Sequence, residues 1–167
     1  MGFQNNTAET EQILTENYER YYRLAYSYMR NEDDALDVVQ ESAYRASRDC
    51  RKVRNKDYLS TWIYRIVVNT ALDMLRRKKK ENITEELPEI PVEDQYQDLE
   101  LRTVLNQLDD KSRTIILLRY FEDLKLEDIA DIVGDNLNTV KARLYRSLKK
   151  LRLNLEAEHY REIPDKS

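Results

Sequence analysis

The sequence is poor in the residues that turns and metal sites require. Its 167 residues include two glycines, three prolines, one cysteine and one histidine. A β-rich fold of this length needs many more turn residues, so we expect an all-α protein. One cysteine excludes an internal disulfide framework, and with a distant histidine it cannot supply the roughly four ligands of a structural zinc site. We therefore predict no metal and no cofactor.

Long apolar runs are also missing. No stretch of about 18 apolar residues occurs, and the N-terminal MGFQNNTAETEQ has no apolar signal-peptide core. We expect a cytoplasmic protein with no membrane insertion of its own. The sequence also lacks a Gly-rich phosphate loop, a Ser/Cys–His pair and a metal cluster, which argues against an enzyme.

Charge is abundant but unevenly distributed. Charged residues make up 36% of the chain and the net charge is −4, a composition that favours two small helical bundles over one large core. Residues 81–98 contain seven acids, two prolines and no Lys or Arg, which is typical of a linker. By contrast, residues 136–152 contain six basic residues and no acid. Most of the negative charge therefore lies between two potentially basic surfaces.

Hydrophobic periodicity predicts helices on both sides of this acidic segment. The predicted helices are 9–30, 32–49, 58–80, 99–108, 111–122, 126–133 and 138–153. Asn31 is a plausible stop for the first helix and a cap for the second. The expected apolar stripe of the second helix is Leu36, Val39, Ala43 and Ala46.

The last two predicted helices have the dimensions of a helix-turn-helix. Ile129 and Val133 are expected to pack, and Gly134 can take the positive φ that ends the first helix of the pair. Val140, Leu144, Leu148 and Leu151 give the second helix an apolar back. Its opposite surface carries Lys141, Ala142, Tyr145, Arg146 and Lys149, which suits a helix in a DNA major groove. A basic amphipathic helix on a protein surface is the alternative.

Three motifs in order resemble the extracytoplasmic-function (ECF) sigma factors of RNA polymerase. They are DALDVVQESAYRA, STWIYRIVVNTALDMLRR and, near the C-terminus, TVKARLYRSLKKLR. The resemblance covers about residues 12–153 and implies two small helical domains joined by an acidic linker. Sigma region 2, a bundle of three to four helices, would occupy 9–80; the linker would be 81–98; and the four-helix region 4 would occupy 99–155.

The resemblance also implies partners and site residues. The polymerase-binding residues, facing the β′ clamp coiled coil, would be Asp37, Gln40, Glu41 and Tyr44. The residues reading melted −10 DNA would be Arg51, Lys52, Arg54, Asn55, Lys56, Arg65, Asn69, Arg76 and Arg77. The residues binding the −35 duplex would be Thr139, Lys141, Ala142, Arg143, Tyr145, Arg146 and Lys149. The implied partners are core RNA polymerase, including its β subunit, promoter DNA and an anti-sigma factor.

Several residues have two interpretations. Trp62 could stack on a base, although such a Trp more often packs between helices, and we favour packing. Asp73 is expected to orient a neighbouring side chain, because a carboxylate repels phosphate. The acidic linker could mimic nucleic acid inside the polymerase or serve as a passive tether.

Two departures from the family pattern matter. Lys125 stands where the family commonly has a Ser or Thr cap, and VRNKDY lacks the Phe-Arg-Gly-like run of many relatives.

The main rival interpretation is a free-standing helix-turn-helix regulator with an N-terminal dimerisation or sensing domain. An all-helical adaptor that binds only protein is a further alternative. The regulator leaves the two N-terminal motifs unexplained, and the adaptor leaves the basic helix near the C-terminus unexplained.

Overall fold

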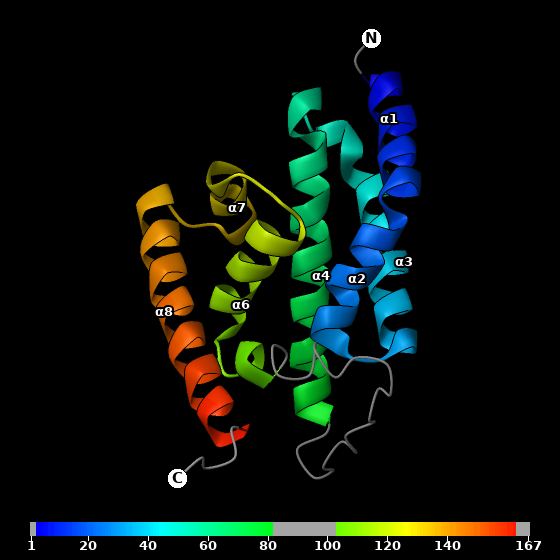
Figure 1. The fold of residues 1–167 in the computed structure, drawn as a ribbon. Coiled ribbons are helices and arrows are strands. Elements are labelled where there is room, and N and C mark those ends of the chain that lie inside the picture. The colour runs from blue at the N-terminus through cyan, green and yellow to red at the C-terminus, as the bar shows by residue number, and fades with distance from the viewer. Residues whose placement is uncertain (1–2, 82–102, 163–167) are drawn as a thin grey trace, which may run out of the picture. The chain divides into compact units, whose positions relative to one another are not determined.

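The computed structural model describes residues 3–81 and 103–162, with side chains described for 6–81 and 103–152. These residues form helices joined by short turns, with no strand among them, which confirms the predicted all-α class (Figure 1). The chain divides into two compact units, Met1–Leu87 and Pro88–Ser167. Among the helices in the described parts of the chain, none combines the length and the hydropathy of a membrane-spanning segment.

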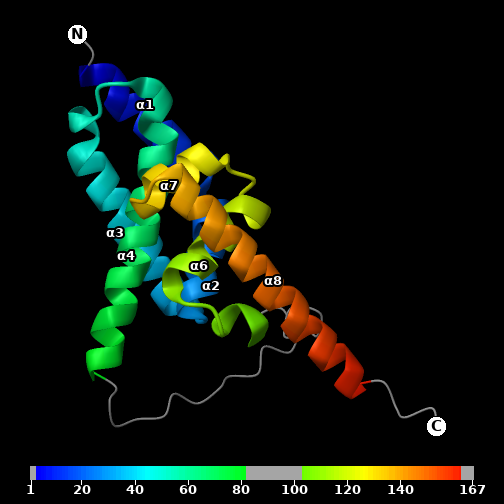
Figure 2. The ribbon, with the colours of Figure 1, turned by 90° about the vertical axis from the view of Figure 1, so that its left-hand side faces the viewer.

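The N-terminal unit is a bundle of four α-helices. They are α1 (Phe3–Glu16), α2 (Tyr18–Met29), α3 (Glu32–Asp49) and α4 (Leu59–Glu81). Two short 3₁₀ turns, η1 (Cys50–Lys52) and η2 (Lys56–Tyr58), connect α3 to α4. The helices α2, α3 and α4 pack against one another, and α1 packs on α3 and η1 (Figure 2). Tyr21 and Tyr64 meet edge-to-face in this core, with ring centroids 5.2 Å apart.

The predicted helix 9–30 is wrong as a single element, because the chain breaks it at Asn17. This residue has φ −111° and ψ 16°. Its Nδ2 donates to the Ile13 carbonyl at 2.9 Å, and its own backbone N–H donates to the same carbonyl at 3.0 Å. Asn is a weak helix former because its short amide competes for nearby backbone groups in this way.

The cap predicted at Asn31 is confirmed: its side-chain oxygen accepts from the Asp34 N–H at 2.8 Å. The apolar stripe predicted for α3 is only partly right. Val39 and Ala46 are buried as predicted, whereas Leu36 and Ala43 are only half-buried. Ala35, Val38 and Ser42 are buried in addition. Because α3 packs against both α2 and α4, its buried arc is displaced from the stripe that periodicity alone suggested.

The C-terminal unit contains the helix-turn-helix. Its described elements are a short helix at 103–106, α6 (Asp110–Ile116), the π-helical turn η3 (Leu117–Phe121), α7 (Leu126–Val133) and α8 (Leu137–Glu162). The predicted helix 111–122 therefore ends in a π turn, in which the Glu122 N–H reaches the Leu117 carbonyl at 3.1 Å. Helix α8 continues nine residues beyond the predicted end at 153. Of the predicted helix 99–108, residues 99–102 lie outside the described residues.

The turn between α7 and α8 forms as predicted. Gly134 has φ 77°, and the Ala130 carbonyl accepts from the N–H groups of Gly134 (2.9 Å) and Asp135 (3.1 Å). Asn136 then caps α8 by accepting from the Thr139 N–H at 2.8 Å. Lys125 precedes α7 and provides no side-chain cap, because its ammonium group cannot accept a hydrogen bond from a backbone N–H. Of the predicted linker 81–98, only Glu81, the last residue of α4, is described.

Candidate functional site

The outward face of α3 presents a polar stripe. Asp37, Gln40, Glu41 and Tyr44 are all exposed, Tyr44 by 61%. Spacings of three and four residues place them along one side of the helix. Asp37, Gln40 and Glu41 also border a shallow hollow between α3 and α4, whose α4 side consists of Thr70, Met74 and Arg77. The residues predicted to bind polymerase thus form one continuous surface.

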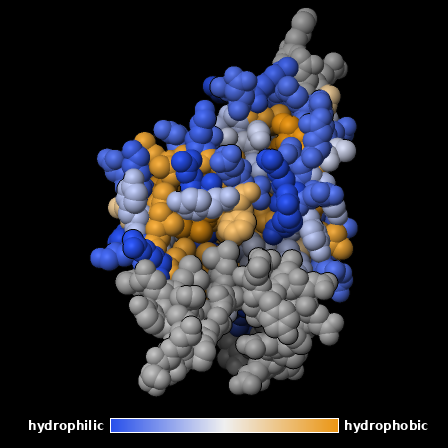
Figure 3. Space-filling view, viewed as in Figure 1, coloured by the Kyte–Doolittle hydropathy of each residue, from blue (hydrophilic) through white to orange (hydrophobic). Residues whose placement is uncertain are grey.

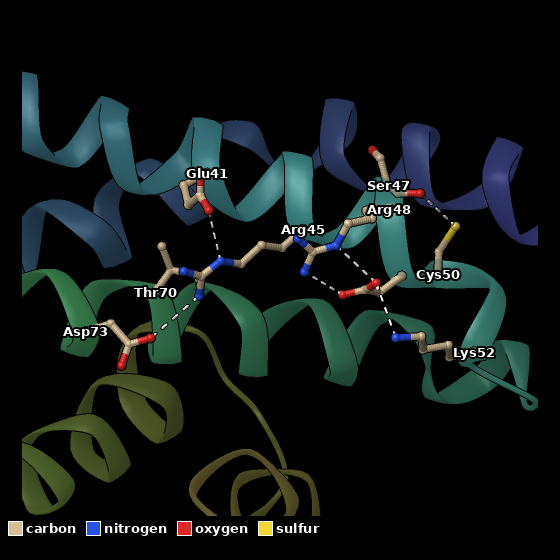
Figure 4. Close-up of polar contacts among 9 residues, drawn as sticks. Glu41, Arg45, Ser47, Arg48, Cys50, Lys52, Thr70 and Asp73 are labelled. Atoms are coloured by element: carbon tan, nitrogen blue, oxygen red, sulfur yellow. Dashed lines mark hydrogen bonds and ion pairs between the residues drawn. The ribbon is translucent and has the colours of Figure 1, made fainter.

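Arg45 fastens this stripe to α4 (Figure 4). Its Nε contacts Glu41 Oε1 at 3.1 Å, and its Nη1 donates to the Thr70 hydroxyl at 3.2 Å. The same Nη1 lies 3.6 Å from Asp73 Oδ2. Asp73 also lies 3.6 Å from Arg76, so it orients neighbouring cations as we expected. The role of Arg45 could not be predicted from the sequence, because periodicity does not reveal contacts between helices.

The end of α3 has an ion pair that limits the positive charge of the following loop. Arg48 binds Asp49 through two hydrogen bonds of 3.1 and 2.9 Å, and Lys52 lies 3.5 Å from the same carboxylate. The hydrogen bond from Arg48 holds the pKa of Asp49 below its usual value. Asp49 is therefore ionised near neutral pH and partly neutralises Lys52. Arg48 also lies over the Tyr44 ring, 5.5 Å from its centroid.

The segment predicted to read melted DNA is strongly cationic and solvent-exposed. Its exposed members are Arg51, Lys52, Arg54, Asn55, Lys56, Arg65, Asn69, Arg76 and Arg77. The Asn55 side-chain oxygen caps η2 by accepting from the Asp57 N–H at 3.0 Å, which leaves its amide N–H groups to face solvent. Trp62 is half-buried, as the packing interpretation predicts. The loop and the exposed side of α4 thus form a basic surface with amide groups at Asn55 and Asn69, whereas Arg77 lies at the hollow beside the α3 stripe.

Helix α8 divides its basic residues between two faces. Lys141, Ala142, Tyr145, Arg146 and Lys149 are exposed, with Tyr145 at 66%. Thr139 is half-buried at the first turn of the helix. Val140, Leu144 and Leu151 are buried as predicted, while Leu148 is half-buried. The exposed set forms a surface with a small Ala between cations.

Arg143 does not join this exposed set. Its Nη1 lies 2.8 Å from Asp109 Oδ2 and 3.4 Å from the Ser112 hydroxyl, so it ties α8 to the start of α6. Burial of the Asp109 carboxylate raises its pKa, but the Ser112 hydrogen bond and the Arg143 charge together lower it below the usual value. Lys150 is exposed but also contacts the rest of the unit, donating to the Gln107 carbonyl at 3.1 Å. Both contacts join α8 to the rest of the C-terminal unit and so stabilise it.

The C-terminal unit also exposes aromatic surface that sequence reasoning did not single out. Tyr120 and Phe121, in the π turn, are 56% and 59% exposed. Apolar side chains are also visible over this unit in Figure 3. Exposed aromatic side chains of this kind are enriched at protein–protein contacts.

Comparison with family models matches both units. Residues 13–81 match sigma-70 region 2, and residues 98–151 match sigma-70, region 4. The RNA polymerase sigma factor SigV of Bacillus subtilis (strain 168) is 48% identical over 149 residues, covering 87% of this chain and 90% of SigV. The ECF RNA polymerase sigma factor SigW of the same strain is 32% identical over 156 residues, covering 82% and 83%.

Solved structures with the same fold include sigma factors. RpoE of Bartonella quintana, crystallised in complex with the anti-sigma factor NepR, aligns with a TM-score of 0.73 and 24% identity, over 87% of this chain and 96% of that one. CnrH, in complex with the cytosolic domain of CnrY, aligns with a TM-score of 0.70 and 20% identity, over 94% and 99%. At this identity the likeness concerns the fold.

Proposed function

Because the chain belongs to the ECF RNA polymerase sigma factors, we propose that it confers promoter recognition on core polymerase through three separate surfaces. Sigma factors are initiation factors and not enzymes. The observation that carries this proposal is the separation of charge: a polar-acidic stripe on α3, a basic loop and face on α4, and a basic face on α8. Each has the chemistry of a different partner.

The α3 stripe is the proposed polymerase contact, within a region 2 domain spanning 9–80. Asp37 and Glu41 supply carboxylates and Gln40 supplies an amide, which suit the basic, hydrogen-bonding β′ clamp coiled coil. Tyr44 adds a large, rigid ring of the kind that anchors protein interfaces. Arg45 restricts Glu41, so less side-chain entropy is lost when the partner binds.

The loop after α3 and the exposed face of α4 are the proposed reader of melted −10 DNA. Separating a base from its stack costs a few kcal/mol, which contacts to the single strand must offset. Arg51, Arg54 and Lys56 face solvent and can neutralise phosphates. Asn69 presents both a donor and an acceptor to a base edge or to the sugar-phosphate backbone.

Helix α8 is the proposed reader of the −35 duplex, within a region 4 domain spanning 99–155. Arg146 and Lys149 can reach guanine edges and phosphates, while Ala142 permits close approach to the groove. We assign Arg143 a supporting role, because its guanidinium is engaged by Asp109. Thr139 lies at the N-terminal end of α8, where backbone N–H groups favour phosphate.

Further partners complete the proposal. The acidic linker 81–98 would pass through the polymerase interior, where its charge resembles that of nucleic acid, and contacts to the β subunit would complete the holoenzyme. RpoE, which shares the fold, was solved with the anti-sigma factor NepR, and CnrH with the cytosolic domain of CnrY. We propose an anti-sigma factor for this chain also, and a cytoplasmic location in which free and polymerase-bound forms exchange.

Paired substitutions test the division into surfaces. Gln40→Ala with Glu41→Ala should lower the affinity for core polymerase on the order of tenfold and leave the circular dichroism spectrum unchanged. Gln12→Ala with Glu16→Ala removes the same two side-chain types from an exposed pair on α1 and is the matched control. Equal loss of polymerase affinity in both double variants would contradict the assignment of the α3 stripe.

A further inference from the structure

The N-terminal helix α1 contacts the loop that follows α3. Most of α1 precedes residue 13, where the match to sigma-70 region 2 begins. Asn6, on this helix, is only 4% exposed, and its side chain reaches a segment more than forty residues away. Its Nδ2 donates to the Cys50 carbonyl at 3.1 Å and to the Val53 carbonyl at 2.7 Å.

The geometry fixes which way this amide points. A primary amide has two N–H donors, and each of them is used on a different carbonyl. The reversed amide would place its oxygen against two carbonyl oxygens, which is repulsive. Asn6 therefore joins the two ends of the segment 50–53, and no other orientation of its side chain satisfies both acceptors.

Other contacts hold the same segment from inside. The Val53 N–H donates to the Cys50 carbonyl at 3.2 Å, and the Val53 side chain is 8% exposed. Thr7, beside Asn6, lies 3.9 Å from the Cys50 sulfur. The segment is therefore attached on its inner side, while Arg51, Lys52 and the adjacent Arg54 point into solvent.

We propose that Asn6 is a positioning residue for promoter melting: it fixes the 50–53 backbone so that Arg51, Lys52 and Arg54 are held in register for the displaced DNA strand. A flexible loop would lose conformational entropy on binding that strand, and the buried amide removes this cost in advance. The proposal rests on the proposed role of this loop in −10 recognition. It assigns to α1 a share in DNA recognition without a contact to DNA.

Hydrogen exchange in the free protein tests the structural half of the proposal. Asn6→Asp keeps the shape but puts a carboxylate oxygen against the two carbonyls, so the Val53 amide should exchange on the order of tenfold faster. Amides in the middle of α4 should exchange at the wild-type rate. Gln12→Ala, an exposed change on the same helix, should alter neither. If Asn6→Asp does not fold, Asn6→Ala removes the donors without a charge and carries the same expectations.

Binding of holoenzyme to fork-junction DNA with a single-stranded −10 segment tests the functional half. The Asn6 variant should bind core polymerase within twofold of wild type, yet lose on the order of tenfold of its preference for the promoter −10 strand over a scrambled one. Arg54→Ala, measured in parallel, should weaken binding of the single strand by removing a phosphate contact.

The outcomes separate this inference from the proposed function. If Arg54→Ala has no effect on binding of the single strand, the loop does not read DNA and the proposed function of that surface is wrong. If Arg54→Ala weakens binding but the Asn6 variant retains wild-type preference, or its Val53 amide is unchanged, the positioning role is wrong. Uniformly faster exchange throughout α4 also overturns it, because Asn6 would then serve only global stability.

Discussion

Arg45 offers the sharpest test of how the polymerase-facing helix is held. Its guanidinium pairs with Glu41 on α3 and connects α3 to α4 through Thr70 and Asp73. Arg45→Met keeps most of the aliphatic stem, which packs between the helices, and removes the charge and the donors. The change therefore isolates the polar contacts from the packing.

The expected loss follows from the surroundings of each contact. The Arg45 side chain is 25% exposed, and the carboxylates of Glu41 and Asp73 are 46% and 42% exposed. Water screens such pairs, so each contributes roughly 0.2 to 1 kcal/mol. Thr70 is only 2% exposed, and loss of its charged donor costs about 1 to 2 kcal/mol. We expect Arg45→Met to lower the free energy of unfolding of the N-terminal unit by about 2 kcal/mol.

Trp62 makes this measurable in the full chain. It is the only tryptophan in the sequence and lies in α4, so its fluorescence reports unfolding of the N-terminal unit. Because the free energy of unfolding falls by roughly 1 to 3 kcal/mol per molar of urea, the urea midpoint of Arg45→Met should be lower by about 1 M. Arg48→Met, which removes an exposed cation paired with its sequence neighbour, is the control and should shift the midpoint less.

A double-mutant cycle then separates the contact from general effects. Arg45→Met and Asp73→Asn should be less than additive in their effect on the free energy of unfolding, because both remove the same ion pair. Strict additivity, or a midpoint shift for Arg45→Met no larger than for Arg48→Met, would refute the role of Arg45 as the tie between the two helices.

Three further outcomes concern the C-terminal unit. Arg143→Met should lower its thermal stability, whereas Arg146→Met should weaken −35 duplex binding by holoenzyme and leave stability unchanged; the reverse pattern would contradict the division of α8 into two faces. The pKa of Asp109 is lowered in the folded state, so its stabilising effect is present above about pH 4 and is lost as the pH falls further. Asp109→Asn should reduce this acid sensitivity in circular dichroism titrations, and an unchanged acid transition would argue against the Arg143 pair. Lys149→Ala should reduce the salt dependence of duplex binding by about one counterion; an unchanged slope would place Lys149 away from phosphate.

Local sequence signals were sufficient for much of the fold. Asn31 identified the start of α3 because a cap is a short-range hydrogen bond, to the N–H three residues on. Gly134 identified the helix-turn-helix because only a few residue types tolerate its positive φ. These features depend on residues within a few positions of one another.

Features that depend on distant residues could not be predicted. The π turn in η3 has no periodic signature, and the break at Asn17 depends on a competition for one carbonyl. Arg143 and Arg146 are three positions apart on α8, and only the location of Asp109 decides which of them points inward. The Asn6 contact joins positions 44 and 47 residues apart, which no pattern along the chain reveals.

Run-off transcription from a genomic promoter pool, with purified core RNA polymerase and this protein, tests the proposed sigma activity most directly. We expect specific transcripts only when both are present, and little sequence-specific duplex binding by the free protein at ordinary salt. Tight specific duplex binding without polymerase, together with a failure to support initiation, would contradict it and favour a free-standing helix-turn-helix regulator.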